Sequence, residues 1–210
     1  MDRSPAESEE TLRMLRRARS GDEQAFDQLF AQHRAYLRQV IELRLDPNVR
    51  RRVDPSDVVQ EAQLEAARRL GTYLDQPEIP FRLWLRQIAY DQVLMAWRQH
   101  VRAKRRTADR DLPLPERSSL QLAQQLLASG TTPSQQAVRS ELGRRVRQAV
   151  AKLPESDREV LLMRNFEGLS NQEVAQVLQI EPTAASKRYG RALLRLRPLL
   201  LEGGVSESQT

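Results

Sequence analysis

The 210-residue sequence contains no cysteine and only two histidines, His33 and His100. Disulfide bonds and thiolate zinc sites are therefore excluded, and two imidazoles are too few to form a structural metal site by themselves. We accordingly expect neither a metal ion nor another cofactor.

Long apolar runs are also missing. No segment approaches the roughly 20 consecutive apolar residues that a membrane-spanning helix needs. The first ten residues are polar and acidic, unlike the basic stretch and apolar run of a secretory signal. These absences predict a cytoplasmic protein that does not associate with a membrane.

Aromatic residues make up only 5% of the chain, whereas charged residues make up 30%. Because β-sheet cores draw heavily on aromatic and β-branched residues, this composition favours compact helical bundles. The formal net charge of +6 favours a polyanionic partner, since each Lys or Arg placed on a phosphate releases counterions. Nucleic acid is the leading partner class, and a mildly basic soluble protein without such a partner is the alternative.

Apolar residues at helical spacing predict four helices in the first half of the chain. The predicted helices span residues 11–18, 23–45, 54–73 and 80–102. Asp46-Pro47 supplies a stop after the second helix, and Asp54 followed by Pro55 suits the start of the third. Together they predict one helical domain over residues 1–106, a usual domain size.

Loop and turn residues dominate residues 107–133, which we interpret as a linker. Helical periodicity then predicts helices over 134–153 and 154–164, and two more that begin near Ser170 and Pro182. These form a second domain over 134–202, followed by a polar tail, 203–210, that we expect to be disordered. The predicted fold class is all-α, with two small helical domains joined by a flexible linker, the C-terminal one a helix-turn-helix.

The most specific local feature is the segment 169–194, whose pattern is typical of a helix-turn-helix. Ser170 and Glu173 form an S-x-x-E capping box, which marks the start of the first short helix. The second helix has an apolar face and an opposite face with short and cationic side chains, which suits the major groove of DNA. A solvated charged face on an ordinary helical hairpin is the alternative. We interpret Gly190 within this helix as a point of close backbone approach.

The predicted helix 54–73 also has two different faces. Val59, Ala62, Ala66, Leu70 and Tyr73 share one side and are predicted to lie in the core, whereas an acidic set projects from the other. This outward set consists of Asp57, Gln60, Glu61 and Leu64. Because phosphates would repel its carboxylates, the set suits a basic protein partner rather than DNA, and a merely solvated acidic face is the alternative.

The predicted helix 80–102 combines aromatic and basic residues. Its predicted core side consists of Phe81, Trp84, Leu85, Ile88, Met95 and Ala96. A different face is formed by Arg86, Tyr90, Leu94 and Trp97, and it leads into Arg98, Arg102, Lys104, Arg105 and Arg106. Aromatic rings beside cations can stack on unpaired bases while the cations hold the backbone, and simple packing of the rings is the alternative.

In this order, these features resemble the extracytoplasmic-function group of bacterial sigma-70 family factors, over residues 11–200. The segment from Asp54 to Glu61 is similar to region 2.2, which implies docking on the β′ clamp helices of RNA polymerase. The segments 81–89 and 90–106 are similar to regions 2.3 and 2.4, which implies melting of the downstream promoter element and capture of its bases on the non-template strand. Residues 153–164 with the helix-turn-helix resemble region 4, which implies binding to the upstream element and to the β flap.

The resemblance assigns three sets of binding residues. The polymerase-binding set is Asp57, Gln60, Glu61 and Leu64. The set for the downstream element is Arg86, Tyr90, Trp97, Arg98, Arg102, Lys104 and Arg105. The set for the upstream element is Thr183, Ala184, Ser186, Lys187, Arg188 and Arg191. The sequence departs from the family at Gln179, where glycine is frequent, and an anti-sigma factor is a further expected partner.

We therefore predict a non-enzymatic sigma subunit that binds core polymerase and both double-stranded and non-template single-stranded promoter DNA. A stand-alone helix-turn-helix regulator is the alternative. It would need a dimer interface or a receiver domain, and the sequence contains a pattern for neither. An enzyme would need a convergent nucleophile, base or metal set, which the sequence also does not suggest.

Overall fold

The computed structural model of the chain describes residues 8–45, 47–101 and 136–202. All regular secondary structure in these ranges is helical, which confirms the predicted all-α class. The chain divides into two compact units, Met1–Ala108 and Asp109–Thr210, referred to as unit 1 and unit 2. The predicted linker, 107–133, and the predicted tail, 203–210, lie outside the described residues.

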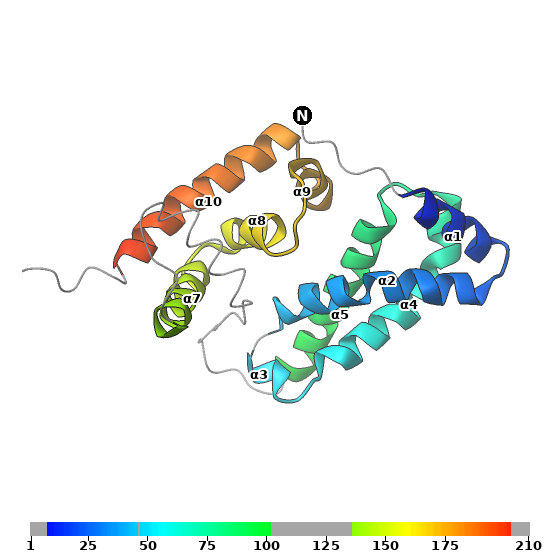
Figure 1. The fold of residues 1–210 in the computed structure, drawn as a ribbon, viewed down its shortest axis with the longest axis horizontal. Helices are drawn as coiled ribbons and strands as arrows, with labels where there is room; N and C mark the ends of the chain where they lie inside the picture. The colour runs from blue at the N-terminus through cyan, green and yellow to red at the C-terminus, as the bar shows by residue number, and fades with distance from the viewer. Residues whose placement is uncertain (1–7, 46, 102–135, 203–210) are drawn as a thin grey trace, which may run out of the picture. The chain divides into compact units, whose positions relative to one another are not determined.

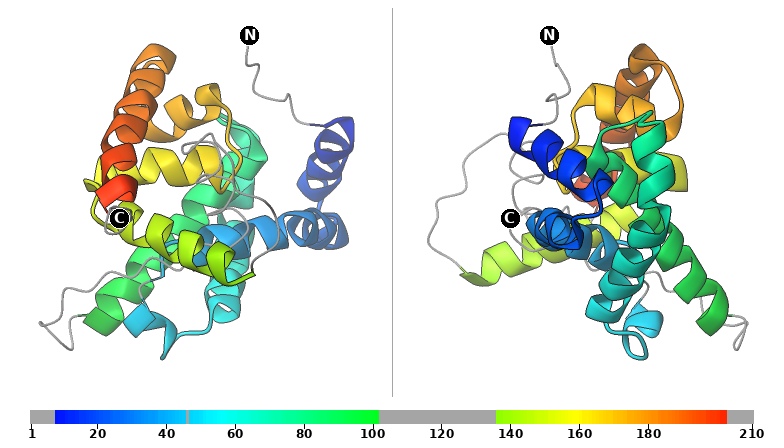
Figure 2. Two further views of the ribbon diagram at one scale, coloured as in Figure 1. Left: turned by 60° about the vertical axis from the view of Figure 1, so that its left-hand side comes forward. Right: turned by 90° about the vertical axis from the view of Figure 1, so that its right-hand side faces the viewer.

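Unit 1 is a helical bundle (Figures 1 and 2). Its helices are α1 (Glu9–Arg19), α2 (Glu23–Glu42), α3 (Pro47–Arg50), α4 (Pro55–Asp75) and α5 (Phe81–Val101). The long helices α2, α4 and α5 pack on one another, and α1 packs on α2 and α4. The short helix α3 follows the stop predicted at Asp46-Pro47 and contacts α5. Among the described helices of unit 1, it is the one that periodicity did not predict.

The core of unit 1 combines large aliphatic residues with a small aromatic cluster. Phe30, Leu37 and Phe81 have almost no exposed surface. The rings of Tyr73 and Trp84 stack with their centroids 4.5 Å apart, and Phe81 lies 5.7 Å from Tyr73. Tyr73, Phe81 and Trp84 thus form an aromatic cluster between α4 and α5, and each contributes a large buried area.

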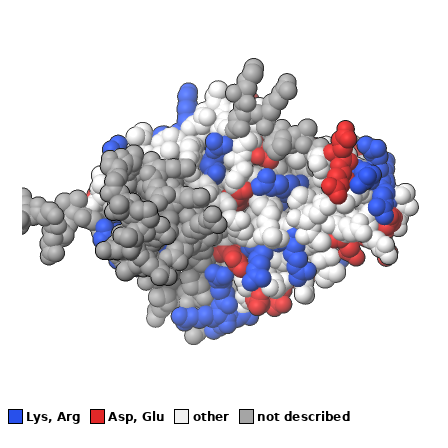
Figure 3. All heavy atoms as spheres, viewed as in Figure 1, with Lys and Arg blue, Asp and Glu red and all other residues white. Residues whose placement is uncertain are grey.

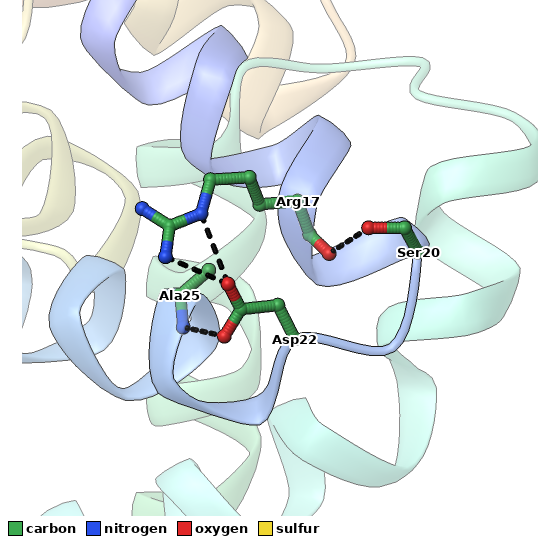
Figure 4. A network of polar contacts seen from close by, with 4 residues as sticks. All are labelled: Arg17, Ser20, Asp22 and Ala25. Atoms are coloured by element: carbon green, nitrogen blue, oxygen red, sulfur yellow. Dashed lines mark hydrogen bonds and ion pairs between the residues drawn. The ribbon is translucent and has the colours of Figure 1, made fainter.

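The turn between α1 and α2 is held by Asp22 (Figure 4). Its Oδ1 accepts a hydrogen bond from the backbone N–H of Ala25 (3.1 Å), which caps α2. Its Oδ2 accepts hydrogen bonds from Nε and Nη2 of Arg17, at 2.9 and 2.7 Å. The Arg17 guanidinium and the Ala25 N–H lower the pKa of the Asp22 carboxyl. The start of α2 is therefore fixed by charge-assisted hydrogen bonds.

The start of α4 follows the sequence prediction. The Asp54 side chain accepts a hydrogen bond from the backbone N–H of Ser56 at 2.7 Å, and Pro55 stands in the first turn. The predicted core face of α4 is also confirmed: Val59, Ala62 and Ala66 are fully buried. Leu70 and Tyr73, the remaining members, pack against the same core.

The structure corrects the predicted core side of α5 at one position. Phe81, Leu85, Ile88 and Ala96 are buried as predicted, and Trp84 packs against the core. Met95, however, is 41% exposed. The first half of α5 is surrounded by α2 and α4 and buries residues on most of its circumference, so apolar spacing alone does not define a single core side there.

Unit 2 consists of four helices in its described part, residues 136–202. They are α7 (Gln136–Ala151), α8 (Glu155–Asn165), α9 (Asn171–Leu178) and α10 (Pro182–Glu202). The long helix α10 packs against the other three. Val146, Val160, Leu161 and Leu196 are completely buried and form the centre of this second core. In the part of the chain that the structure describes, no helix has the length and apolar character needed to cross a bilayer.

Candidate DNA-binding and protein-binding surfaces

The helix-turn-helix predicted over residues 169–194 is formed by α9, α10 and the turn between them. The Ser170 hydroxyl accepts a hydrogen bond from the backbone N–H of Glu173 (3.2 Å), and Glu173 Oε2 accepts one from the backbone N–H of Ser170 (2.7 Å). This is the predicted capping box. Glu173 is buried, so the capping contact also fixes α9 in the interior of unit 2.

The turn between α9 and α10 has one strained residue. Gln179 has φ 53° and ψ 45°, and it is the one non-glycine residue with positive φ in the described ranges. Its backbone N–H closes the end of α9, and the N–H of Ile180 donates to Ala175 O at 3.0 Å. Asn171 Nδ2 donates to Pro182 O at 2.8 Å, which joins the first residue of α9 to the first residue of α10. These hydrogen bonds hold the two helices at a defined angle.

The buried face of α10 agrees with the predicted spacing. Ala185, Ala192 and Leu196 are completely buried. The Tyr189 hydroxyl donates a hydrogen bond to Asn165 Oδ1 at 3.1 Å. The opposite face begins at the N-terminus of α10 and consists of exposed Thr183, Ala184, Ser186, Lys187 and Arg191, with half-buried Arg188. We call these six residues the reading face. Its short side chains and cations suit the major groove of a duplex.

A second surface lies on α4. Asp57, Gln60 and Glu61 are exposed, and Leu64 is 53% exposed. We call these four residues the acidic-leucine patch. The residues share one side of the helix, opposite the buried Val59 and Ala62, as their spacing predicted.

Two hollows flank the acidic-leucine patch. One, of about 390 Å³, lies between α4 and α5 and includes Asp57, Glu61 and the exposed Met95 in its lining. The other, of about 650 Å³, lies between α4 and the α1–α2 turn and includes Gln60 and Leu64. The patch is therefore a ridge of carboxylates, an amide and a leucine between two depressions, a shape that can receive the side chains of a basic helical partner.

A third surface follows the C-terminal half of α5. Trp97 is 42% exposed and Arg98 is exposed, whereas Tyr90 is half-buried. The guanidinium of Arg44, which follows α2, lies 5.6 Å from the centroid of the Tyr90 ring. Figure 3 shows Lys and Arg side chains on both units in the view of Figure 1.

Within the described residues, no group of three or more His, Asp or Glu side chains is arranged to hold a metal ion.

Comparisons with known proteins identify the family of this chain. The family model "Sigma-70, region 4" matches residues 143–196, a range that contains the helix-turn-helix. The chain is 30% identical over 199 residues to the RNA polymerase sigma-H factor of Pseudomonas aeruginosa, covering 92% of this chain and 97% of that protein. It is 31% identical over 189 residues to the ECF RNA polymerase sigma factor ShbA of Streptomyces griseus, covering 89% and 93%. The chain is an extracytoplasmic-function sigma factor of the sigma-70 family.

A solved structure supports the same assignment for the fold. The structure of CnrH in complex with the cytosolic domain of CnrY superimposes on this sigma factor with a TM-score of 0.60 and 28% identity, covering 92% of this chain and 99% of that one. As a sigma factor, the protein confers promoter recognition on RNA polymerase and supports DNA melting at transcription initiation.

One residue predicted for the downstream element departs from that prediction. Arg86 is only 3% exposed, so it offers no surface to DNA in this conformation of the sigma factor. It lies in the part of α5 that is enclosed by neighbouring helices, which explains why face assignment by spacing misplaced it. Arg102, Lys104 and Arg105, predicted for the same element, lie outside the described residues.

Two features of α10 also differ from expectation. Among the described residues, a Cβ atom built at Gly190 meets nothing within 4 Å. The close backbone approach that we inferred from the sequence therefore does not explain this glycine. Arg195, the basic residue that follows Arg191 on α10, makes an ion pair with Asp157 of α8. That arginine stabilises unit 2 internally rather than extending the reading face.

Sequence reasoning missed one exposed residue of α10. Leu194 is 73% exposed, the largest fraction among the large apolar residues of the described ranges. Its position seven residues after Lys187 and three after Arg191 places it near the reading face on a helical projection. That spacing is the signal that could have identified it.

Proposed function

We propose that the reading face of α10 recognises the upstream promoter element in the major groove. The observation that carries this proposal is the exposure of Lys187 and Arg191 together with the short side chains of Thr183, Ala184 and Ser186. Cations can contact phosphates and guanine edges, while short side chains allow the helix to approach the base pairs closely. The capped turn supports this role because it presents the start of α10 in a fixed orientation.

The acidic-leucine patch is proposed to dock on the β′ clamp helices of core polymerase. Its carboxylates would pair with basic side chains of the partner, and Leu64 would lose its exposed apolar surface on binding. The adjacent hollows support this assignment, since they provide space for partner side chains on both sides of the patch.

The exposed side of α5 is proposed to capture bases of the non-template strand when the downstream element opens. Trp97 offers an exposed ring, half-buried Tyr90 offers the part of its ring that Arg44 leaves accessible, and Arg98 offers a cation beside them. Stacking on aromatic rings tolerates many bases, so it suits a strand that has just been separated. Arg102, Lys104 and Arg105 are proposed to hold the backbone of the same strand.

Two DNA-contacting units on one chain suggest why core polymerase is required. Each unit alone would have a small interface with DNA, whereas core polymerase would hold both at the spacing of one promoter. Unit 2 is proposed to bind the β flap as well. We further propose that the protein acts in the cytoplasm without catalytic activity of its own, and that an anti-sigma factor binds it, as the CnrH complex with CnrY supports.

Transcription with purified bacterial core polymerase and a random promoter library tests the main proposal. Adding the chain should create new, sequence-specific start sites. Substitution of Asp57, Gln60 and Glu61 by alanine should abolish co-purification with core polymerase. A matched control replaces Glu10, Gln76 and Glu78, which are exposed elsewhere on unit 1, and should bind like the unmodified chain. Full binding by the patch variant would refute the docking assignment.

A further inference from the structure

Three consecutive arginines span the end of α3 and the connection to α4, and they have no role in the surfaces described so far. Arg50 ends α3, and Arg51 and Arg52 follow it. We call these three residues the arginine turn. The turn has a defined backbone, because the N–H groups of Arg52 and Val53 both donate to Val49 O at 2.9 Å.

The arginine turn is anchored beside α5. Val49 is 2% exposed and belongs to the same buried cluster as Val93 of α5. Figures 1 and 2 show α3 next to the C-terminal end of α5 in every view, in agreement with the contacts between these helices. The turn therefore lies at the same end of unit 1 as Trp97 and Arg98.

The link between this end of the bundle and the proposed base-stacking face is also direct. Arg44, only a few residues before α3, places its guanidinium 5.6 Å from the centroid of the Tyr90 ring. The segments before and after α3 thus both lie beside α5 in unit 1.

Nearby carboxylates neutralise only part of this surface. Glu42 Oε1 accepts a hydrogen bond from Arg38 Nε at 2.8 Å and lies 3.9 Å from Arg50 Nη2. The pKa of Asp54 is lowered, first by its hydrogen bonds with Ser56 and then by Arg38 and Arg50. The side chains of Arg51 and Arg52 are exposed, and neither has an ion pair within the described part of the chain. Two guanidinium groups therefore remain exposed on a hydrogen-bonded turn.

We propose that Arg51 and Arg52 bind phosphates of the promoter DNA whose bases contact α5. This inference rests on the proposed function of α5 and adds a second element to its DNA surface. A guanidinium presents several donors in a planar fork, which matches phosphate oxygens, and its contact with a phosphate releases counterions. The arginine turn would thereby set the path of the DNA backbone across unit 1.

The salt dependence of promoter binding by the holoenzyme tests this proposal. The probe is a fluorescent promoter duplex recovered from the random library with the unmodified chain. For the variant with Arg51→Gln and Arg52→Gln, two lost contacts to phosphates of the separated strand should reduce the slope of log K against log salt by about 1.4. Between 50 and 200 mM salt, the unmodified holoenzyme should therefore lose about sevenfold more affinity than the variant. Replacement of both arginines by lysine should retain most of the slope, because the charge remains.

The matched control replaces Arg13 and Arg16 by glutamine. Both are exposed on α1, which contacts α2 and α4 rather than α3, and the change in net charge is the same. This control should keep the slope of the unmodified holoenzyme. If both double variants change the slope equally, the proposal of a specific phosphate site is wrong. A loss of core polymerase capture by the Arg51/Arg52 variant would also overturn it, since the turn would then bind protein.

The absence of cysteine permits a second, independent measurement. Arg51→Cys creates a unique thiol to which an iron chelate can be attached, and the holoenzyme should then cleave promoter DNA near the downstream element. The same chelate at Arg13→Cys should not cleave there. Absence of cleavage from position 51 would refute the proposal. If the unmodified chain itself neither binds core polymerase nor directs initiation, the proposed function fails instead, so the two failures are distinguishable.

Discussion

Arg195 Nη1 donates a hydrogen bond to Asp157 Oδ2 at 2.5 Å and so connects the middle of α10 to the first turn of α8. Asp157 is 3% exposed, whereas more than half of the Arg195 side chain is accessible. The buried carboxylate depends on this partner, because a buried acceptor without a hydrogen bond bears the full cost of desolvation. The pair therefore stabilises the packing of the helix that carries the reading face.

Arg195→Ala should lower the free energy of unfolding of unit 2 by about 1–3 kcal/mol, since it leaves the Asp157 carboxylate buried without its partner. Amide hydrogen exchange in α8 and α10 measures this change. Arg197→Ala is the control: Arg197 is exposed and has no ion pair among the described residues. Its effect should stay within about 0.5 kcal/mol. Equal protection in the two variants would contradict the assigned role of the pair.

Gly190→Ala should stabilise unit 2 by about 1 kcal/mol, because glycine in a helix interior is less favourable than alanine and the added methyl group meets no atom. Amide hydrogen exchange in α10, measured at increasing temperature, reports the gain in the stability of unit 2. Gly168→Ala should have the opposite sign, since Gly168 has φ of 68°, which costs a non-glycine residue roughly 1–2 kcal/mol. A destabilised Gly190→Ala protein would show that the helix needs the glycine for packing.

Gln179→Gly should also stabilise the helix-turn-helix, by about 1 kcal/mol, because it relieves a left-handed conformation that glycine adopts without steric cost. The comparison variant is Gln176→Gly, an exposed position inside α9, where the same change should destabilise by roughly 0.5–1 kcal/mol. Opposite shifts in the melting temperature are expected. Shifts of the same sign would argue against strain at Gln179.

His33 should make unit 1 less stable in mild acid. Its Nε2 is buried without a hydrogen-bond partner in the described residues, and its ring lies 5.6 Å from that of Phe81. Burial, and then the charge of Arg82, lower the pKa of His33 below 6.5. Below that pH the unfolded chain binds a proton that the folded protein does not, so stability falls until the folded-state pKa is reached.

Urea unfolding between pH 8 and pH 5, at about one-unit intervals, measures this effect. Both tryptophans, Trp84 and Trp97, belong to unit 1, so fluorescence reports on this unit alone. His33→Leu should remove most of the pH dependence of the unfolding free energy between pH 8 and pH 5. Carboxylates continue to titrate at lower pH. An unchanged profile in the variant would show that other groups are responsible.

Local patterns predicted the features that depend on neighbours in the sequence. The capping box of Ser170 and Glu173 involves residues three positions apart, and the exposure of the acidic-leucine patch follows from helical spacing alone. The starts of α9 and α10, predicted near Ser170 and Pro182, were located correctly for the same reason. The fold class and the faces of α4 and α10 were therefore accessible from the sequence.

Features that depend on distant residues were not accessible. Asp157 and Arg195 are 38 positions apart, and nothing in either segment indicates the other. The burial of Arg86 and the exposure of Met95 depend on how α2 and α4 enclose one half of α5 and leave the other open. Helical spacing distinguishes two sides of a helix, whereas tertiary packing decides how many sides are covered.

The hydrogen bonds at the junction of α9 and α10 come from the Asn171 side chain and from the backbone of the turn. None of the reading-face side chains at 183, 184, 186 and 187 takes part. Randomising those four positions should therefore yield folded proteins with altered DNA preference. Variants that each act only on their own promoters could then be selected for engineered gene circuits.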